Sequence, residues 1–256
     1  MSSRLLRDAQ GIDVRAGMDG MDGLDGMDGL DGMERRRHAW RIEADEYARH
    51  ERRRGHRHAY TELSGKRTAL VVVDMVRFFV AGNGFGLGIV PQVQALADGT
   101  RSAGGTVAWV LPAVAAQPTR WAVDFYGPEV AERYRLAGGT GTVADRLWPE
   151  LVPAPEDAVV EKTAASAFFP GRCPLPEVLD ERGVDTVIVC GLVTNVCVEA
   201  TVRDAATLGY RVVLAADGCA TRSDTAHNAT LATVYRSFGD VRATADILTL
   251  LDGQPA

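Results

Sequence analysis

The sequence predicts an α/β fold in three layers, with a six-stranded, mainly parallel sheet between two layers of helices. From residue 68 onward, short apolar runs rich in β-branched residues alternate with segments of helical periodicity. A chain that alternates strands with helices forms a parallel sheet covered on both faces. The 256 residues, 46% of them hydrophobic, suffice for one such domain with an appendage.

Strands are expected where apolar runs are bounded by turn residues, and helices where apolar residues recur every three or four positions. The expected strands are residues 68–73, 106–111, 158–160, 186–190 and 211–215, followed by a short one near Val241. The expected helices are residues 91–102, 174–182, 195–208 and 226–238. Parallel sheets bind ligands beyond the carboxyl ends of their strands, so we expect the site there.

The first 65 residues differ in composition from the rest. Residues 18–32 are five Met/Leu-Asp-Gly triplets, and this low complexity predicts that residues 1–33 form a disordered tail. In residues 34–65, Trp40, Ala44 and Tyr47 recur at helical spacing, which predicts a helical N-terminal arm that packs on the body or on a neighbouring subunit. Acidic residues among its arginines argue against an RNA-binding arm. The main domain is expected over residues 66–256.

Composition and charge exclude several classes of protein. No apolar run is long enough to span a membrane, and no apolar segment of a secretory signal follows the N-terminus. The net charge of −6 argues against a nucleic-acid partner. Four cysteines without a CxxC pair argue against a disulfide framework and a structural zinc site. We therefore expect a cytoplasmic protein that acts on a small molecule.

Three chemically capable side chains follow expected strands. Asp74 comes directly after the apolar strand TALVVV, and Lys162 ends the run VVEK. Cys197 follows the strand at residues 186–190 and falls in the first turn of the next helix, where unpaired N–H groups lower a thiol pKa and stabilise an oxyanion. Each has a structural alternative: Asp74 as a helix cap, Lys162 as half of a surface ion pair, Cys197 as a core residue. Their coincidence at one sheet edge favours a catalytic site.

The segment GLVTNVCVEATVRDAATLGYRVVLAADGCAT, residues 191–221, resembles the signature of isochorismatase-like cysteine hydrolases, the superfamily that includes N-carbamoylsarcosine amidase. Asp74 and Lys162 match the other two positions of the same family. The resemblance covers about residues 66–250, and the cysteine segment is its most specific part. It implies a Rossmann-like three-layer fold for the main domain.

The resemblance also implies the roles of the site residues. Asp74, Lys162 and Cys197 would form a catalytic triad, with Asp74 as the base and Lys162 supporting the thiolate. A cis peptide would join Leu192 to Val193, and the N–H groups of Val193 and Cys197 would form an oxyanion hole. No cofactor is implied, and relatives assemble as homodimers or homotetramers.

Departures from the family pattern limit the reactions that the chain is expected to catalyse. Nicotinamidases of the family bind a metal through an Asp and two His near the end of the second strand, but residues 109–121 contain no histidine, so no metal is expected. His227 on the last expected helix reads as structural or as a subunit contact. True isochorismatases lack the cysteine, so Cys197 favours amide chemistry.

The function expected from these features is a cysteine-dependent amidohydrolase that cleaves a C–N bond of a small amide, ureido (N-carbamoyl) or lactam compound through a thioester-type intermediate. Two alternatives remain: a vinyl-ether hydrolase of the isochorismatase type, in which the thiol is incidental, and a non-catalytic binding protein on the same fold. Candidate pocket residues share an aromatic ring and a position at a strand end or in the following loop. They are Phe79, Trp121, Phe125 and Phe168.

Overall fold

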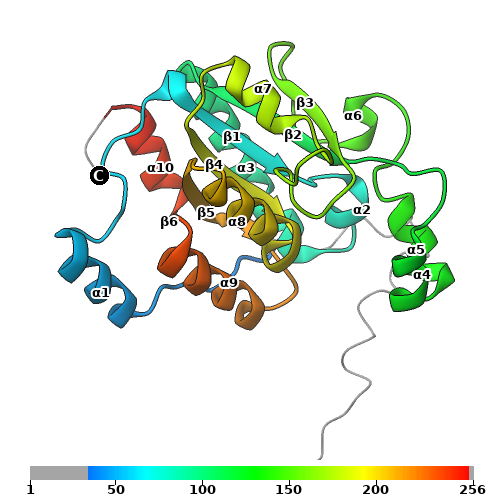
Figure 1. Cartoon of the computed structure of the whole chain (residues 1–256), viewed down its shortest axis with the longest axis horizontal. Coiled ribbons are helices and arrows are strands. Elements are labelled where there is room, and N and C mark those ends of the chain that lie inside the picture. Colours follow the sequence, from blue (N-terminus) through cyan, green and yellow to red (C-terminus); the bar gives the residue numbers. More distant parts are fainter. Residues whose placement is uncertain (1–33, 254–256) are drawn as a thin grey trace, which may run out of the picture. The chain divides into compact units, whose positions relative to one another are not determined.

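A parallel six-stranded sheet organises the computed structural model, which describes residues 34–253 (Figure 1). Its strands are β1 (Thr68–Val73), β2 (Thr106–Pro112), β3 (Ala158–Lys162), β4 (Thr186–Leu192), β5 (Arg211–Ala220) and β6 (Asp240–Arg242). They lie in the order β3-β2-β1-β4-β5-β6, and each neighbouring pair is parallel. The predicted fold class is confirmed. The prediction for residues 1–33 lies outside the described residues.

Burial along each strand follows its place in the sheet. Every residue of the central strands β1 and β4 is buried, because helices cover both of their faces. The edge strand β3 instead alternates buried and exposed residues, and Val159 is 41% exposed. The continuous apolar runs in the sequence therefore mark the centre of the sheet.

The strand order reverses between β1 and β4. From this point the chain extends the sheet through β2 to β3 on one side and through β5 to β6 on the other. Connections leave the carboxyl ends of β1 and β4 in opposite directions, which opens a crevice between them. The fold thus places a ligand site beyond β1 and β4.

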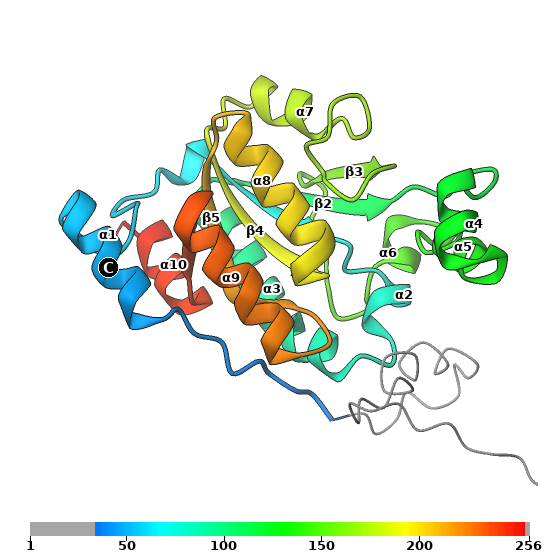
Figure 2. The same cartoon turned by 60° about the horizontal axis from the view of Figure 1, so that its bottom comes forward.

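Helices cover both faces of the sheet. Their bounds are α1 (Ala44–Arg54), α2 (Arg77–Val80), α3 (Gly84–Ser102), α4 (Arg120–Tyr126), α5 (Pro128–Arg135), α6 (Val143–Arg146), α7 (Leu175–Glu181), α8 (Glu199–Thr207), α9 (Asp224–Ser237) and α10 (Thr244–Leu251). α8 and α9 pack on one face, and α3 lies on the other with α10 against it (Figures 1 and 2). No helix in residues 34–253 is long and apolar enough to cross a membrane.

Helix α3 begins earlier than its sequence suggests. The expected start was Pro91, but the helix starts at Gly84, where the side chain of Asn83 accepts a hydrogen bond from the Gly86 N–H as an N-cap. Glycine is a poor helix former, so the segment GFGLG reads as a loop. Tertiary packing overrides that propensity here.

The N-terminal arm contains a shorter helix than predicted and an extended segment. Only α1 is helical, and Trp40 precedes it while still packing against the core. α1 lies against α9: Arg236 forms an ion pair with Glu46 at 3.2 Å, and Tyr47 meets the ring of Tyr235 edge to face. The arm therefore packs on the body of its own chain.

Buried Asp240 in β6 fastens the end of the arm. Its carboxylate lies 3.0 Å from His58 Nδ1, accepts the Ala59 N–H at 3.1 Å, and pairs with the buried Arg242 at 3.0 Å. Burial acts to raise the pKa of Asp240, but the bond from His58 and the charges of His58 and Arg242 outweigh it and hold that pKa below its ordinary value.

We expect Asp240→Asn to destabilise the fold by about 3–5 kcal/mol, because it leaves the Arg242 charge buried without its partner. Since the folded pKa is depressed, the contribution is complete above the unfolded pKa of about 3.9 and disappears as pH falls through the folded value. Urea unfolding at several pH values measures both effects.

The matched control is Asp185→Asn, which removes an exposed ion pair with Arg67. Such pairs contribute about 1 kcal/mol or less. If the two variants lowered the free energy of unfolding equally, Asp240 would contribute no more than an exposed ion pair.

Candidate active site

Asp74, Lys162 and Cys197 converge at the carboxyl edge of the sheet. Asp74 follows β1, Lys162 is the last residue of β3, and Cys197 lies in the π-helical turn Thr194–Val198 between β4 and α8, hereafter the Cys197 turn. Lys162 Nζ lies 2.8 Å from Asp74 Oδ2 and 3.5 Å from Cys197 Sγ. The structure therefore brings the three predicted residues into direct contact.

The backbone of Asp74 turns sharply at the end of β1. Its φ of 53° is the left-handed conformation, which Asp tolerates better than most residues. Its N–H still donates to Val110 O at 2.9 Å, so a hydrogen bond to β2 fixes the point where the turn starts. The side chain is 99% buried in consequence of this turn, since only 1% of Asp74 is exposed.

The Asp74 carboxylate is free to take up a proton. Lys162 lies 2.8 Å from Oδ2, but within residues 34–253 no donor meets hydrogen-bond geometry at either oxygen. Burial raises its pKa, against the lowering effects of Lys162 and of the Cys197 thiol. A carboxylate of raised pKa with open lone pairs suits a general base.

Lys162 reaches the site from two strands away. It is paired in register with Pro112 at the end of β2, which separates β3 from β1. Its long side chain crosses this gap, is only 4% exposed, and also donates to Ala164 O at 3.1 Å. Burial acts to lower its pKa, but Asp74 and Cys197 outweigh burial and raise it, so Lys162 remains positively charged.

The turn after β4 presents Cys197. The peptide bond between Leu192 and Val193 is cis, and Val193 O accepts the N–H groups of Val196 and Val198. Cys197 keeps some accessible surface, whereas the other cysteines, Cys173, Cys190 and Cys219, are buried. Among the chain's thiols it is the one that a substrate can reach.

The expected lowering of the thiol pKa is wrong in this structure. Burial raises the pKa of Cys197 to about 12; the Asp74 charge adds to this effect and Lys162 opposes it. Although the residue has accessible surface, dense protein around the sulfur disfavours a thiolate. Cys197 lies in the first helical turn after β4, as expected, but this turn is π-helical and runs directly into α8, which begins at Glu199. The resting site is thus a thiol beside a charged Asp74–Lys162 pair.

The four candidate pocket residues lie in different surroundings. Phe79 is partly buried and meets Phe78 edge to face, whereas Trp121 and Phe125 on α4 stack on each other and are 62% and 69% exposed. Phe168 has no exposed surface and packs against Tyr210. Phe168 is therefore a core residue in this structure and cannot line a pocket.

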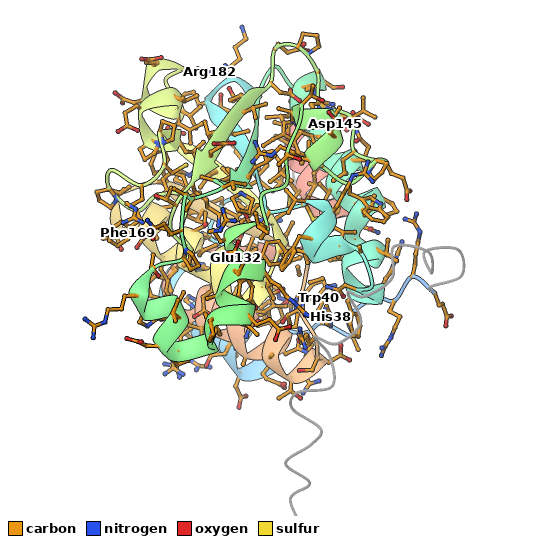
Figure 3. All side chains as sticks on the ribbon, turned by 90° about the vertical axis from the view of Figure 1, so that its right-hand side faces the viewer. His38, Trp40, Glu132, Asp145, Phe169 and Arg182 are labelled. Atoms are coloured by element: carbon orange, nitrogen blue, oxygen red, sulfur yellow. The ribbon has the colours of Figure 1, made fainter. Side chains whose placement is uncertain are left out.

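Sequence reasoning missed two residues near the thiol, Tyr134 on α5 and Arg222 after β5. Burial raises the pKa of Tyr134; among its neighbours Tyr126 and Cys197 raise it further and Arg222 lowers it, so Tyr134 lies near both Cys197 and Arg222. Viewed onto the carboxyl edge of the sheet, α4 and α5 lie in front of it (Figure 3). Arg222 could have been found, because it follows the carboxyl end of a strand, as Asp74 does.

The described residues contain no group of three or more His, Cys, Asp or Glu side chains placed to hold a metal ion. His227 is fully buried in α9, where its Nδ1 lies 3.0 Å from Thr194 Oγ1. It therefore takes the structural role that was one of its two expected roles.

Comparison with known proteins relates this site to one family. Residues 68–246 match the family description "Isochorismatase domain". The uncharacterized isochorismatase family protein YwoC of Bacillus subtilis is 34% identical over 188 residues, which are 72% of this chain and 93% of that protein.

Solved structures agree. A cysteine hydrolase from Pseudomonas syringae pv. phaseolicola superposes with a TM-score of 0.67 at 28% identity, covering 77% of this chain and 97% of that one. N-carbamoylsarcosine amidase from Thermoplasma acidophilum gives a TM-score of 0.55 at 26% identity, covering 70% of this chain and 96% of that one.

The charges around the thiol predict opposite effects of two substitutions. Asp74→Asn removes the charge that raises the pKa of Cys197 and leaves Lys162 without its partner, so we expect alkylation of Cys197 by iodoacetamide at pH 8 to accelerate about tenfold or more. Lys162→Met should slow it. Mass spectrometry locates the label, and Cys197→Ser is the blank.

In the unaltered protein Cys197 should react more slowly than an unfolded thiol at the same pH. If Asp74→Asn instead slowed alkylation as Lys162→Met does, Asp74 would already hold the thiol proton in the resting state, and the assigned charges would be wrong.

Proposed function

The chain belongs to the isochorismatase family, and from this premise we propose that it is a cysteine-dependent amidohydrolase that cleaves a C–N bond in a small amide, ureido (N-carbamoyl) or lactam compound. The observation that carries the proposal is the contact of Lys162 with both Asp74 and the Cys197 thiol. A nucleophile, a base and a fixed positive charge within one contact distance are the parts that acyl transfer requires.

The first step is attack on the substrate carbonyl. As Sγ of Cys197 bonds to the carbonyl carbon, its proton passes to a free oxygen of Asp74, so a free thiolate need not accumulate despite the raised thiol pKa. The Lys162 ammonium stays protonated and offsets the negative charge that develops on sulfur. Burial strengthens this attraction because the surroundings are poorly polarisable.

The C–N bond of the tetrahedral intermediate then breaks, and the amine or ammonia leaves. The N–H groups of Val193 and Cys197 would donate to the oxyanion, a role inferred from their place in the Cys197 turn. When the C–N bond breaks, Asp74 returns its proton to the leaving nitrogen, and the acyl or carbamoyl group remains on sulfur. Water next attacks this thioester, giving a proton to Asp74, and the departing sulfur takes that proton back.

Ureido acids suit the surroundings of the thiol best among the three substrate classes. Arg222 and Cys197 both act electrostatically on the Tyr134 hydroxyl, so a guanidinium belongs to the same side of the molecule as the thiol and offers a partner for a substrate carboxylate. The structural similarity to an N-carbamoylsarcosine amidase agrees with this preference.

We expect turnover within a panel of amides and N-carbamoyl amino acids, assayed by ammonia release, and of lactams, assayed by the amino acid that ring opening produces. The same assays should show a loss of kcat of about a thousandfold or more in Cys197→Ser. Mass spectrometry of the working enzyme should detect the acyl or carbamoyl adduct on Cys197. Full turnover of any substrate by Cys197→Ala would instead support the vinyl-ether reaction, and a vinyl-ether compound belongs in the panel for that reason.

Arg222→Ala tests the substrate preference. We expect KM for carboxylate-bearing substrates to rise about tenfold or more, because a charge-assisted contact is lost, while neutral amides are unaffected. Arg120→Ala is the control, since the Arg120 side chain is 95% exposed on α4. An equal rise of KM for charged and neutral substrates would exclude a carboxylate contact.

A further inference from the structure

The first described residues of the arm, 34–43, form an extended segment, hereafter the strap, that lies directly on helix α3. Arg36 N–H donates to Gly84 O at 2.9 Å. A Cβ on Gly88 would stand 1.7 Å from Arg36 O, and one on Gly84 would stand 2.8 Å from Glu34 O. Glycines in the first turns of α3 therefore admit the strap, which explains why this helix begins with poor helix formers.

The strap inserts the side chain of His38 into the body. The side chain is 2% exposed, and its ring stacks between those of Phe85 and His227, with centroid distances of 4.0 and 4.2 Å. Figure 3 shows His38 and Trp40 beside α9. Burial lowers the pKa of His227 to about 3, so the ring beneath His38 is uncharged.

Hydrogen bonds set one tautomer of His38. The Thr221 N–H donates to Nε2 at 3.1 Å, so this nitrogen carries no proton. Nδ1 then bears the hydrogen and donates it to Asp224 at 2.7 Å. The imidazole is therefore a neutral bridge between the loop after β5 and the start of α9.

Two of the residues that His38 contacts, Thr221 and His227, also hold the start of the Cys197 turn. Thr221 Oγ1 donates to Asn195 Oδ1 at 2.7 Å, and His227 Nδ1 lies 3.0 Å from Thr194 Oγ1. Thr194 and Asn195 are the first two residues of the turn that carries Cys197. Two short chains of contacts thus run from one strap side chain to the side chains that begin the Cys197 turn.

We propose that His38 is a positioning residue of the active site, which holds the Cys197 turn in register with Lys162 from outside the family domain. It lies thirty residues before the family match begins at residue 68, so the strap is outside the matched residues. The catalytic meaning of the inference rests on the proposed function, whereas the placement of the thiol beside Lys162 can be measured without any substrate.

His38→Phe is the principal variant, because it preserves the stacked ring and removes both hydrogen bonds. We expect kcat to fall between about tenfold and a hundredfold with KM little changed, since small misplacements of a nucleophile have such effects. His38→Gln can still accept the Thr221 N–H and should recover part of the loss.

Gly88→Ala displaces the strap without altering any residue that touches the Cys197 turn, and it should reproduce the effect of His38→Phe. Gly99→Ala is the matched control in the same helix, because its Cβ would meet only the end of the Leu248 side chain. If His38→Phe and Gly88→Ala lowered the unfolding midpoint but left kcat unchanged, the strap would be a structural support and the proposal would fail.

A substrate-free test uses a double-mutant cycle between His38 and Lys162. If His38 keeps the thiol beside Lys162, the slowing of Cys197 alkylation by Lys162→Met should shrink at least about threefold in the His38→Phe background. If Lys162→Met slowed alkylation of Cys197 by the same factor with and without His38→Phe, the inference would be overturned. If the two substitutions are coupled but the protein turns over no compound, the proposed function is contradicted and the positioning role of His38 stands. If the protein turns over a substrate but the two substitutions are not coupled, the proposed function stands and the positioning role is contradicted.

Discussion

The buried ion pair between Lys162 and Asp74 is the interaction on which the site depends. Two charges that are 96% and 99% buried are costly to remove from water, and each is tolerable only because the other lies 2.8 Å away. Their meeting requires the parallel register that ends β3, β2 and β1 at one edge, and the left-handed turn that aims Asp74 into the crevice. The thiol is placed beside this pair by the connection on the other side of the strand reversal, so the topology of the sheet and the charges of the site form one arrangement.

Much of this could be predicted from residues in order along the chain. Apolar runs marked the strands, and Asp74, Lys162 and Cys197 stood where parallel strands end, so their convergence followed from topology. What could not be predicted depends on packing. Phe168 is buried while the adjacent Phe169 is 52% exposed, and in a loop no periodicity tells which of the two rings faces the core. The raised pKa of Cys197 depends on how densely protein surrounds the sulfur, which no sequence pattern records. Tyr134 escaped notice because α5 was not expected.

The arm illustrates the limit of composition as a guide. Its arginines and histidines suggest a solvated, charged appendage, yet His38 and His58 point inward and form specific hydrogen bonds, one with Thr221 and Asp224, the other with Asp240. In the sequence, the glycines of α3 predict a break in the helix; in the structure, they allow the strap to approach the helix closely. In both cases a local departure from propensity is resolved by a contact with a residue distant in sequence, which is the usual reason that such departures persist.

The strap also has a consequence for the order in which the chain assembles. It is among the earlier parts of the described chain to be synthesised, but the partners of His38 at Thr221, Asp224 and His227 belong to the last seventh or so of the sequence. Because domains fold as their segments become available, the strap must wait until α9 exists before it can dock. The Cys197 turn, though built earlier, would acquire its final brace only then. A nascent or truncated chain that lacks α9 would therefore carry the nucleophile in the turn after a complete β4 but without the support of the strap.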